Sequence, residues 1–390
     1  MSEYGKVSVN ANIIKKEVNA LFKFKGNPLL ALTSCIGMEL DEKGVFTLYG
    51  CTENTTFCKE VPTISTVGKF DVVIEKGVFA ELLSGKFKNE DEYFYEITVK
   101  NRVEVVRKKS ENFYNEFFGE KIEKIDNSNC STFEIVCDDT GDLNCGNFKN
   151  SLYRKIGKTI GKKFEKVSFK SFEDIKLLKD KSDLSCPTVT NGNIFVTDNC
   201  FIYKYETDLP FDLIYAKDAI PLLKKFSNSL FDAYLFKLEG KERVLLIDNA
   251  EGLTITLENS GLGKYHPTEK IKNFVQNTIG KQKASFTIKR IEFEESIDRV
   301  KLFTLDFDNN AYIIENIGDT NIKQMSNNRH YTEYLQAAVK GNFKVLVNAE
   351  QVYSLVKLCK SEYIIVNIYS DVIEVVDGHK SYMVAVLLEE

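Results

Sequence analysis

The chain has 390 residues, which is long for one hydrophobic core and comfortable for two or three domains. Hydrophobic residues make up 43% and charged residues 28%, ordinary values for a soluble globular protein, and no stretch is apolar enough to cross a membrane. The amino-terminal residues lack the apolar core of a signal peptide, so we expect a cytoplasmic location, or a host's cytoplasm if the protein is viral.

Cysteine and histidine usage argues against a metal centre. The nine cysteines form no CxxC pair, and the three histidines are scattered without the spacing of metal ligands. An odd number of cysteines also argues against a disulfide framework. We therefore expect no metal and no cofactor, and interpret the thiols as small core residues.

The first third of the chain predicts alternating strands and helices. A strand at 7–9 leads into a helix from Ala11 whose apolar residues share one face. A second strand, Phe70-Asp71-Val72-Val73-Ile74, leads into a helix over 76–88. Further strands are expected at 93–99 and 103–107.

The same order then recurs twice. A strand at 132–136 precedes a helix near 147–163, and a strand at 285–288 precedes a helix near 289–302. Two more runs match the one that begins at Phe70, namely those that begin at Phe211 and Phe343, and helices over 217–229 and 348–360 follow them. Asn348 is placed to cap the last helix, with Gln351 three residues later. Strands are expected after these helices at 233–238, 244–247, 253–257, 363–368, 372–376 and 383–388.

The three runs are 141 and 132 residues apart, which implies an internal repeat of domain size. The sequence therefore predicts an α+β fold of three domains, each built from two strand–helix–strands units. The predicted domains span 1–126, 127–278 and 279–390.

Positive charge is concentrated on the six predicted helices. They hold 22 Lys and Arg against 8 Asp and Glu, although the whole chain has a net charge of −5. In the helix over 147–163, the predicted apolar face is Phe148, Leu152, Tyr153, Ile156 and Ile160. Basic residues lie opposite that face. A single basic helix is usually a solvated surface, but the recurrence favours contact with phosphates, independent of base sequence. The candidate DNA-binding residues are Lys25, Lys149, Arg154, Lys155, Lys158, Lys162, Lys163, Lys224 and Lys225.

With this unit order the chain resembles the β-type DNA sliding clamps, the polymerase III β-subunit family of bacterial and phage replication. The resemblance covers nearly the whole length and rests on the segments around 70–85, 186–230 and 343–388. It implies that two three-domain chains close head to tail into a homodimeric ring, with helices lining the pore and sheets outside. The implied function is that of a processivity factor that encircles duplex DNA. Its implied partners are a DNA polymerase and a clamp loader.

The resemblance also implies a pocket for hydrophobic partner peptides between the second and third domains. The family's pocket loop, Thr-Asp-Gly-His-Arg-Leu, aligns with 197–202, and its carboxy-terminal wall, Val-Met-Pro-Met-Arg, aligns with 384–388. Thr197, Asp198 and Asn348 match by identity. Asn199, Cys200, Phe201, Ala385 and Val386 do not, which leaves the usual peptide motif open. The implied pocket residues are Leu184, Thr197, Asn199, Cys200, Phe201, Ile202, Ala216, Asn348, Val384, Ala385, Val386 and Leu387.

Four residues are candidates for the interface between domain 1 of one chain and domain 3 of the other: Val103, Val105, Leu302 and Phe303. No catalytic motif stands out. Gly157-Lys158-Thr159 lacks the first glycine of a phosphate-binding loop, and Asp306, Asp308 and Asn310 lack the glycine and glutamate of a calcium loop. We therefore do not expect an enzyme. The alternative function is a clamp-fold scaffold that binds or antagonises replication proteins without forming a ring.

Overall fold

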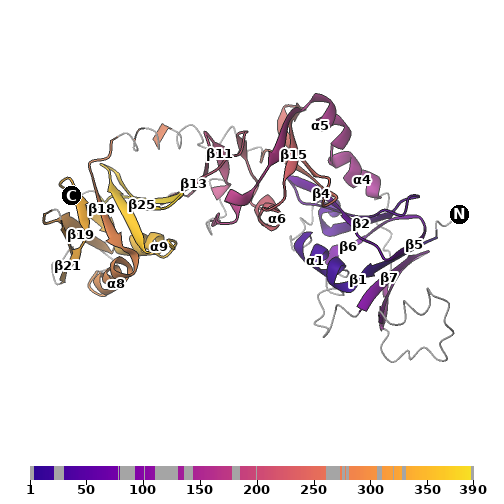
Figure 1. The fold of residues 1–390 in the computed structure, drawn as a ribbon, viewed down its shortest axis with the longest axis horizontal. Coiled ribbons are helices and arrows are strands. Elements are labelled where there is room, and N and C mark those ends of the chain that lie inside the picture. Colours follow the sequence, from indigo (N-terminus) through magenta and orange to yellow (C-terminus); the bar gives the residue numbers. More distant parts are fainter. Residues whose placement is uncertain are drawn as a thin grey trace. The chain divides into compact units, whose positions relative to one another are not determined.

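The fold is described from a computed structural model. The described residues are 4–21, 30–77, 79, 93–100, 102–109, 131–135, 144–177, 185–198, 200–260, 273–274, 277, 281–304, 310–318, 320–326 and 331–387. They form two compact units (Figure 1). Unit 1 comprises 1–173 and 218–261, and unit 2 comprises 174–217 and 262–390. Within the described parts, no helix is long and apolar enough to span a membrane.

Unit 1 contains a five-stranded sheet, sheet A, with the strand order β5-β1-β7-β8-β9. All neighbours in it are antiparallel. Helix α1 (Ala11–Leu21) follows β1 and packs against β1 and β7 of this sheet and against β4 of the next. The bounds of the strands are β1 Gly5–Asn10, β5 Ser65–Gly68, β7 Tyr93–Val99, β8 Val103–Lys109 and β9 Ser131–Ile135.

The second sheet of unit 1, sheet B, has eight strands in the order β10-β15-β16-β17-β4-β3-β2-β6. Its two halves come from distant parts of the chain and meet where β4 pairs with β17, from Leu253 opposite Lys59 to Leu257 opposite Thr55. The bounds are β2 Cys35–Leu40, β3 Phe46–Cys51, β4 Thr55–Val61, β6 Phe70–Glu75, β10 Lys162–Val167, β15 Phe231–Leu238, β16 Lys241–Asp248 and β17 Leu253–Glu258.

Both faces of sheet B are covered, and different helices cover them. Residues that lie opposite one another on paired strands point to the same face of the sheet. The strand pairings therefore assign each side chain of sheet B to one of its two faces. The face that contains Met38, Leu48 and Leu246 is called the α1 face; α1 and α6 (Ala219–Lys225) lie on that side (Figure 1). The face that contains Tyr49 and Leu245 is called the α5 face, and α4 (Cys145–Ser151) and α5 (Arg154–Ile160) lie across it.

Unit 2 repeats these arrangements. Its nine-stranded sheet C has the order β14-β11-β12-β13-β26-β25-β24-β18-β22, and its four-stranded sheet D the order β21-β20-β19-β23. Helices α8 (Arg290–Lys301) and α9 (Ala349–Val356) pack on each other and on strands of both sheets. The strand bounds of sheet C are β11 Thr188–Thr190, β12 Asn193–Thr197, β13 Phe201–Glu206, β14 Leu213–Ile214, β18 Ala284–Lys289, β22 Ala338–Lys340, β24 Tyr363–Ile368, β25 Val372–Asp377 and β26 Lys380–Ala385. Those of sheet D are β19 Ala311–Asn316, β20 Asn321–Ser326, β21 Thr332–Gln336 and β23 Lys344–Asn348.

Most predicted elements are confirmed, including the helix at 289–302 and the strands at 93–99 and 363–368. The Asn348 cap is confirmed, because its side chain accepts a hydrogen bond from the Gln351 N–H at 3.0 Å. Two predictions are wrong. The helix at 147–163 is two short helices followed by strand β10. The strand predicted to open the second domain is present as β9, but it pairs with β8 in sheet A.

Candidate nucleic-acid and partner interfaces

Helix α4 is fixed to the α5 face by its first residues. The Cys145 N–H donates to the Asp71 carboxylate at 3.0 Å. One turn later, Phe148 is fully buried and stacks on Tyr49 with ring centroids 6.2 Å apart. Lys149 forms an ion pair with Glu39 on β2. These contacts hold α4 on the α5 face of sheet B.

The helix breaks at Tyr153, which adopts a left-handed conformation with φ of 49°. Such a conformation costs a non-glycine residue about 1–2 kcal/mol, so neighbouring contacts must stabilise it. The Thr256 hydroxyl donates to the Leu152 carbonyl. The Tyr153 ring lies 4.6 Å from the buried Arg243 guanidinium and 6.3 Å from the Phe236 ring. Segment 144–160 therefore crosses the seam between β4 and β17 with a fixed bend; we call it the strap.

Helix α5 rests on the sheet through glycine. A Cβ added at Gly157 would lie 3.0 Å from side-chain atoms of both Leu245 and Phe236, so a larger residue here would have to displace these side chains. The prediction that Ile156 and Ile160 lie on the apolar face is wrong. They are 40% and 56% exposed, because the bend at Tyr153 rotates α5 relative to α4.

The predicted DNA-binding residues do not share one surface. Arg154, Lys155 and Lys158 are exposed on α5 and have no ion pair in the part of the chain that the structure describes. Lys162 and Lys163 lie on β10 rather than on a helix, and Lys163 pairs with Glu165 and Asp232. Lys224 and Lys225 lie on α6, on the other face of sheet B. Lys225 donates to the Lys16 carbonyl at 3.0 Å, and Lys25 lies outside the described residues.

The loop between β12 and β13 is held by two of the identity matches, Thr197 and Asp198. The Thr197 hydroxyl donates to the Phe201 carbonyl at 2.8 Å. The Asp198 carboxylate accepts from the N–H groups of Cys200 and Phe201, each at 2.7 Å. Such short polar side chains stabilise tight turns. The matched residues therefore fix the loop's shape, and Cys200 is exposed at its tip.

Phe201 leads this loop into the seam between β13 and β26, where it lies opposite Val384. Phe201 and Val384 share one face of sheet C, and Ile202 lies on the opposite face, packed on Phe195. Ala385 is exposed, whereas Val386 and Leu387 are half-buried. The predicted pocket residues therefore divide between two faces of the sheet.

Asn348 and Ala216, two other implied pocket positions, lie outside β13 and β26. The Leu387 N–H donates to the Leu346 carbonyl at 2.8 Å, which places the carboxy-terminal wall beside β23, the strand that ends at Asn348. Ala216 is buried and follows β14, which β11 and β12 separate from β13 in the sheet. Leu184 and Asn199 lie outside the described residues.

The predicted chain–chain interface is only partly exposed. Val103 and Val105 are fully buried on β8, an interior strand of sheet A, so their side chains cannot form a surface between chains. Leu302 is 80% and Phe303 40% exposed, at the end of α8. Phe303 stacks on Tyr331 at 4.8 Å, next to β21, the edge strand of sheet D.

Among the described residues, no group of three or more His, Cys, Asp or Glu could hold a metal ion. Burial raises the pKa of Cys51 to about 12 and that of Cys58 to about 11, so both thiols stay protonated near neutral pH.

Solved structures of sliding clamps share this fold. No protein-family profile and no curated protein matches the sequence. The DNA polymerase III β subunit of Thermotoga maritima matches with a TM-score of 0.68 at 12% identity, over 99% of this chain and 100% of that one. That of Borrelia burgdorferi gives 0.66 at 11% identity, over 100% and 99%. A Pseudomonas aeruginosa sliding clamp bound to griselimycin gives 0.66 at 10% identity, over 99% and 100%. This chain therefore has the fold of the polymerase III β subunit.

Proposed function

We propose that this protein is a sliding clamp. Two copies close into a ring around duplex DNA, and the ring tethers a replicative polymerase without catalysing a reaction. The observation that carries the proposal is the order of the strands in the four sheets. Sheet B joins a half ordered β6-β2-β3-β4 to a half ordered β17-β16-β15-β10. Sheet C joins β14-β11-β12-β13 to β26-β25-β24-β18 in the same way.

Sheets A and D correspond to the two halves of a third such sheet. Sheet D has the order β23-β19-β20-β21, equivalent to the first half, and ends at β21. Sheet A contains β9-β8-β7-β1, equivalent to the second half, and ends at β9. In the complete sheets the corresponding strands pair antiparallel, β4 with β17 and β13 with β26. Pairing β21 of one chain with β9 of another would complete the third sheet and cover both open edges.

This pairing defines the proposed dimer. Two chains offer two such pairs of edges, so the same contact forms twice and the assembly closes. Leu302, Phe303 and Tyr331 lie beside β21 and supply apolar surface to the contact. The three-domain division remains part of the proposal, with its first boundary moved beyond Ile135, because β9 completes sheet A as β26 completes sheet C.

We assign the pore to the helices on the α1 face. Lys15 and Lys16 on α1 and Lys224 and Lys225 on α6 lie on that side of sheet B. The strap lies on the opposite face, so its basic residues would lie outside the ring. Phosphate contacts from the pore lysines would be weak, independent of base sequence and sensitive to salt.

We place the partner site at the loop of Thr197 and Asp198 and the adjoining residues of β13 and the carboxy-terminal wall. Half-buried Phe201 and Leu387 offer apolar contact for a short peptide from a polymerase or a clamp loader. The departures from the family's His-Arg and Met-Pro-Met would make the site prefer its own partners. A cytoplasmic location fits this role.

The dimer is tested by sedimentation equilibrium on the full chain. The proposal expects a mass about twice the 44.5 kDa of one chain at micromolar concentration. A monomer at that concentration would contradict ring closure and favour the alternative function, a clamp-fold scaffold that binds replication proteins without encircling DNA.

A further inference from the structure

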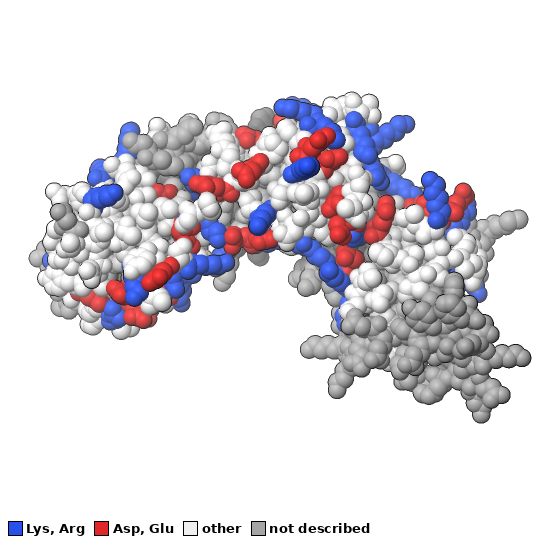
Figure 2. Space-filling model, viewed as in Figure 1, with Lys and Arg blue, Asp and Glu red and all other residues white. Residues whose placement is uncertain are grey.

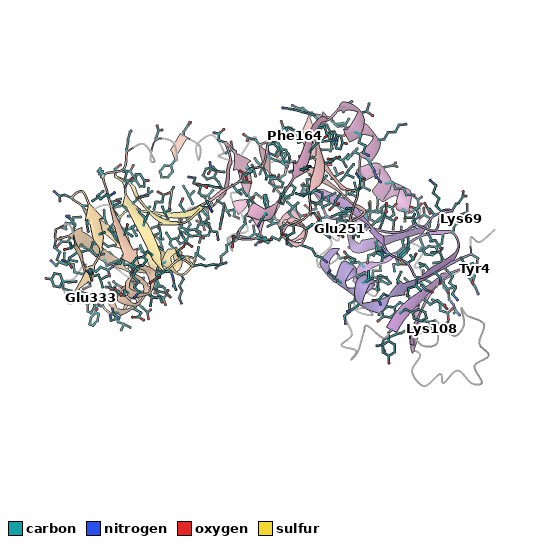
Figure 3. All side chains as sticks on the ribbon, viewed as in Figure 1. Tyr4, Lys69, Lys108, Phe164, Glu251 and Glu333 are labelled. Carbon is teal, nitrogen blue, oxygen red and sulfur yellow. The ribbon has the colours of Figure 1, made fainter. Side chains whose placement is uncertain are left out.

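Helix α5 carries an exposed surface that has no role in the proposed ring. We define the α5 patch as Arg154, Lys155, Ile156, Lys158 and Ile160. All five side chains are exposed, and the patch contains no acidic residue. Figure 2 shows basic side chains gathered over α4 and α5.

The geometry of the patch follows from Gly157. With Gly157 on the sheet and about 100° per residue, Lys155 lies on the crest of the helix. Ile156 and Ile160 lie on one flank, one turn apart, and Arg154 and Lys158 lie on the other. Residues four apart on a helix are close neighbours, so the isoleucines form a continuous apolar strip.

Neither part of the patch is explained by the fold. The isoleucines contribute little to the core at 40% and 56% exposure, and β-branched residues do not favour a helix. Arg154, Lys155 and Lys158 have no acidic partner among the described residues, although the chain as a whole is acidic with a net charge of −5. The residues just before this helix nevertheless contact the sheet: the Tyr153 ring lies on Arg243, and the Leu152 carbonyl accepts from Thr256.

We propose that the α5 patch binds an acidic protein segment that carries apolar anchors about one helical turn apart. Carboxylates would pair with Lys155 and its basic neighbours, and the anchors would cover Ile156 and Ile160. Charge complementarity supports this partner, and the apolar strip favours protein over DNA, because phosphate contacts need only the basic residues. The patch belongs to unit 1 alone, so it does not depend on ring closure.

The test uses fluorescence anisotropy with a labelled synthetic helical peptide that carries two leucines four residues apart among glutamates. Replacing both isoleucines (Ile156→Ser with Ile160→Ser), or reversing two charges (Lys155→Glu with Lys158→Glu), should weaken binding about tenfold or more, which is about 1.4 kcal/mol. Ile291→Ser, at a residue 50% exposed on α8, is the matched control and should bind as wild type does. Thermal melting confirms that each variant is folded.

Two results would overturn the proposal. One is equal binding of a peptide with glutamines in place of the leucines, since the isoleucines would then have no role. The other is a protein that does not bind the peptide but binds a short DNA duplex. In that case the isoleucine variant would bind DNA as wild type does, and the charge-reversal variant would bind DNA more weakly. That result would identify a phosphate-binding surface instead.

Discussion

The Tyr153 ring lies 4.6 Å from the Arg243 guanidinium, so a residue at a helix break contacts a buried cation of the sheet beneath it. Arg243 is only 2% exposed and also donates to Glu258 at 3.0 Å. A desolvated cation over an aromatic ring contributes up to about 2 kcal/mol. This contact helps to hold the strap across the seam between β4 and β17.

Removing that ring should loosen the strap. We expect Tyr153→Ala to lower the free energy of unfolding by about 1–3 kcal/mol, because contacts with both Arg243 and Phe236 are lost. Thr159→Ala, at an exposed position of α5, is the control and should change stability little. Urea denaturation measures both variants. Equal stability of Tyr153→Ala and wild type would show that the bend is maintained without the ring.

The apolar surface beside β21 should control dimer formation. Leu302→Asp places a charge on a residue that is 80% exposed in the single chain, so it should leave the fold intact. Burying that charge between chains should raise the dimer dissociation constant by at least about tenfold. Ile291→Asp, on the same helix, should leave the mass unchanged. Sedimentation equilibrium compares the two, and a stable Leu302→Asp dimer would place the interface elsewhere.

The partner site should depend on the carboxy-terminal wall. We expect Leu387→Asp to abolish stimulation of the cognate polymerase while the dimer persists, because a charge would replace the apolar contact for the peptide. Ile365→Asp, at a residue 44% exposed on β24, serves as the control and should retain stimulation. Primer-extension length measures the effect. Full stimulation by a folded Leu387→Asp dimer would mean that the polymerase docks elsewhere.

Acid should weaken the ion pair between Asp174 and Lys380, which joins segment 174–177 to sheet C. The hydrogen bond from Lys380, at 2.9 Å, lowers the pKa of Asp174. A carboxyl with a lowered pKa in the folded state stabilises the fold above its unfolded pKa of about 4, and that contribution is lost as the pH falls. Asp174→Asn should therefore show a smaller fall in melting temperature from about pH 5 to about pH 3 than wild type does. An identical fall in both proteins would show that the ion pair contributes nothing.

Sequence patterns predicted the positions of helices and strands better than they predicted which strands pair in the sheets. The helix at 289–302 and the strands at 93–99 and 363–368 follow from local periodicity, which the final fold preserves. Pairing of β9 with β8 depends on contacts between distant segments, which periodicity does not encode.

The strap shows the same limit at the level of the site. Its basic residues were recognised, but the face they occupy depends on the left-handed Tyr153 and on Gly157, whose role requires knowledge of Phe236 and Leu245 beneath it. For the partner loop, the sequence identified Thr197 and Asp198, but not that Phe201 and Ile202 point to opposite faces.

Topological retention on DNA tests the central claim most directly. Subunits dissociated by dilution are mixed with nicked circular plasmid, concentrated to allow pairing, and separated from free protein by gel filtration at high salt, which suppresses phosphate contacts. The account expects the protein to elute with the circle and to be lost after a single cut makes the DNA linear. Retention on linear DNA, or a dimer that never stays on the circle, would contradict a ring that encircles duplex DNA.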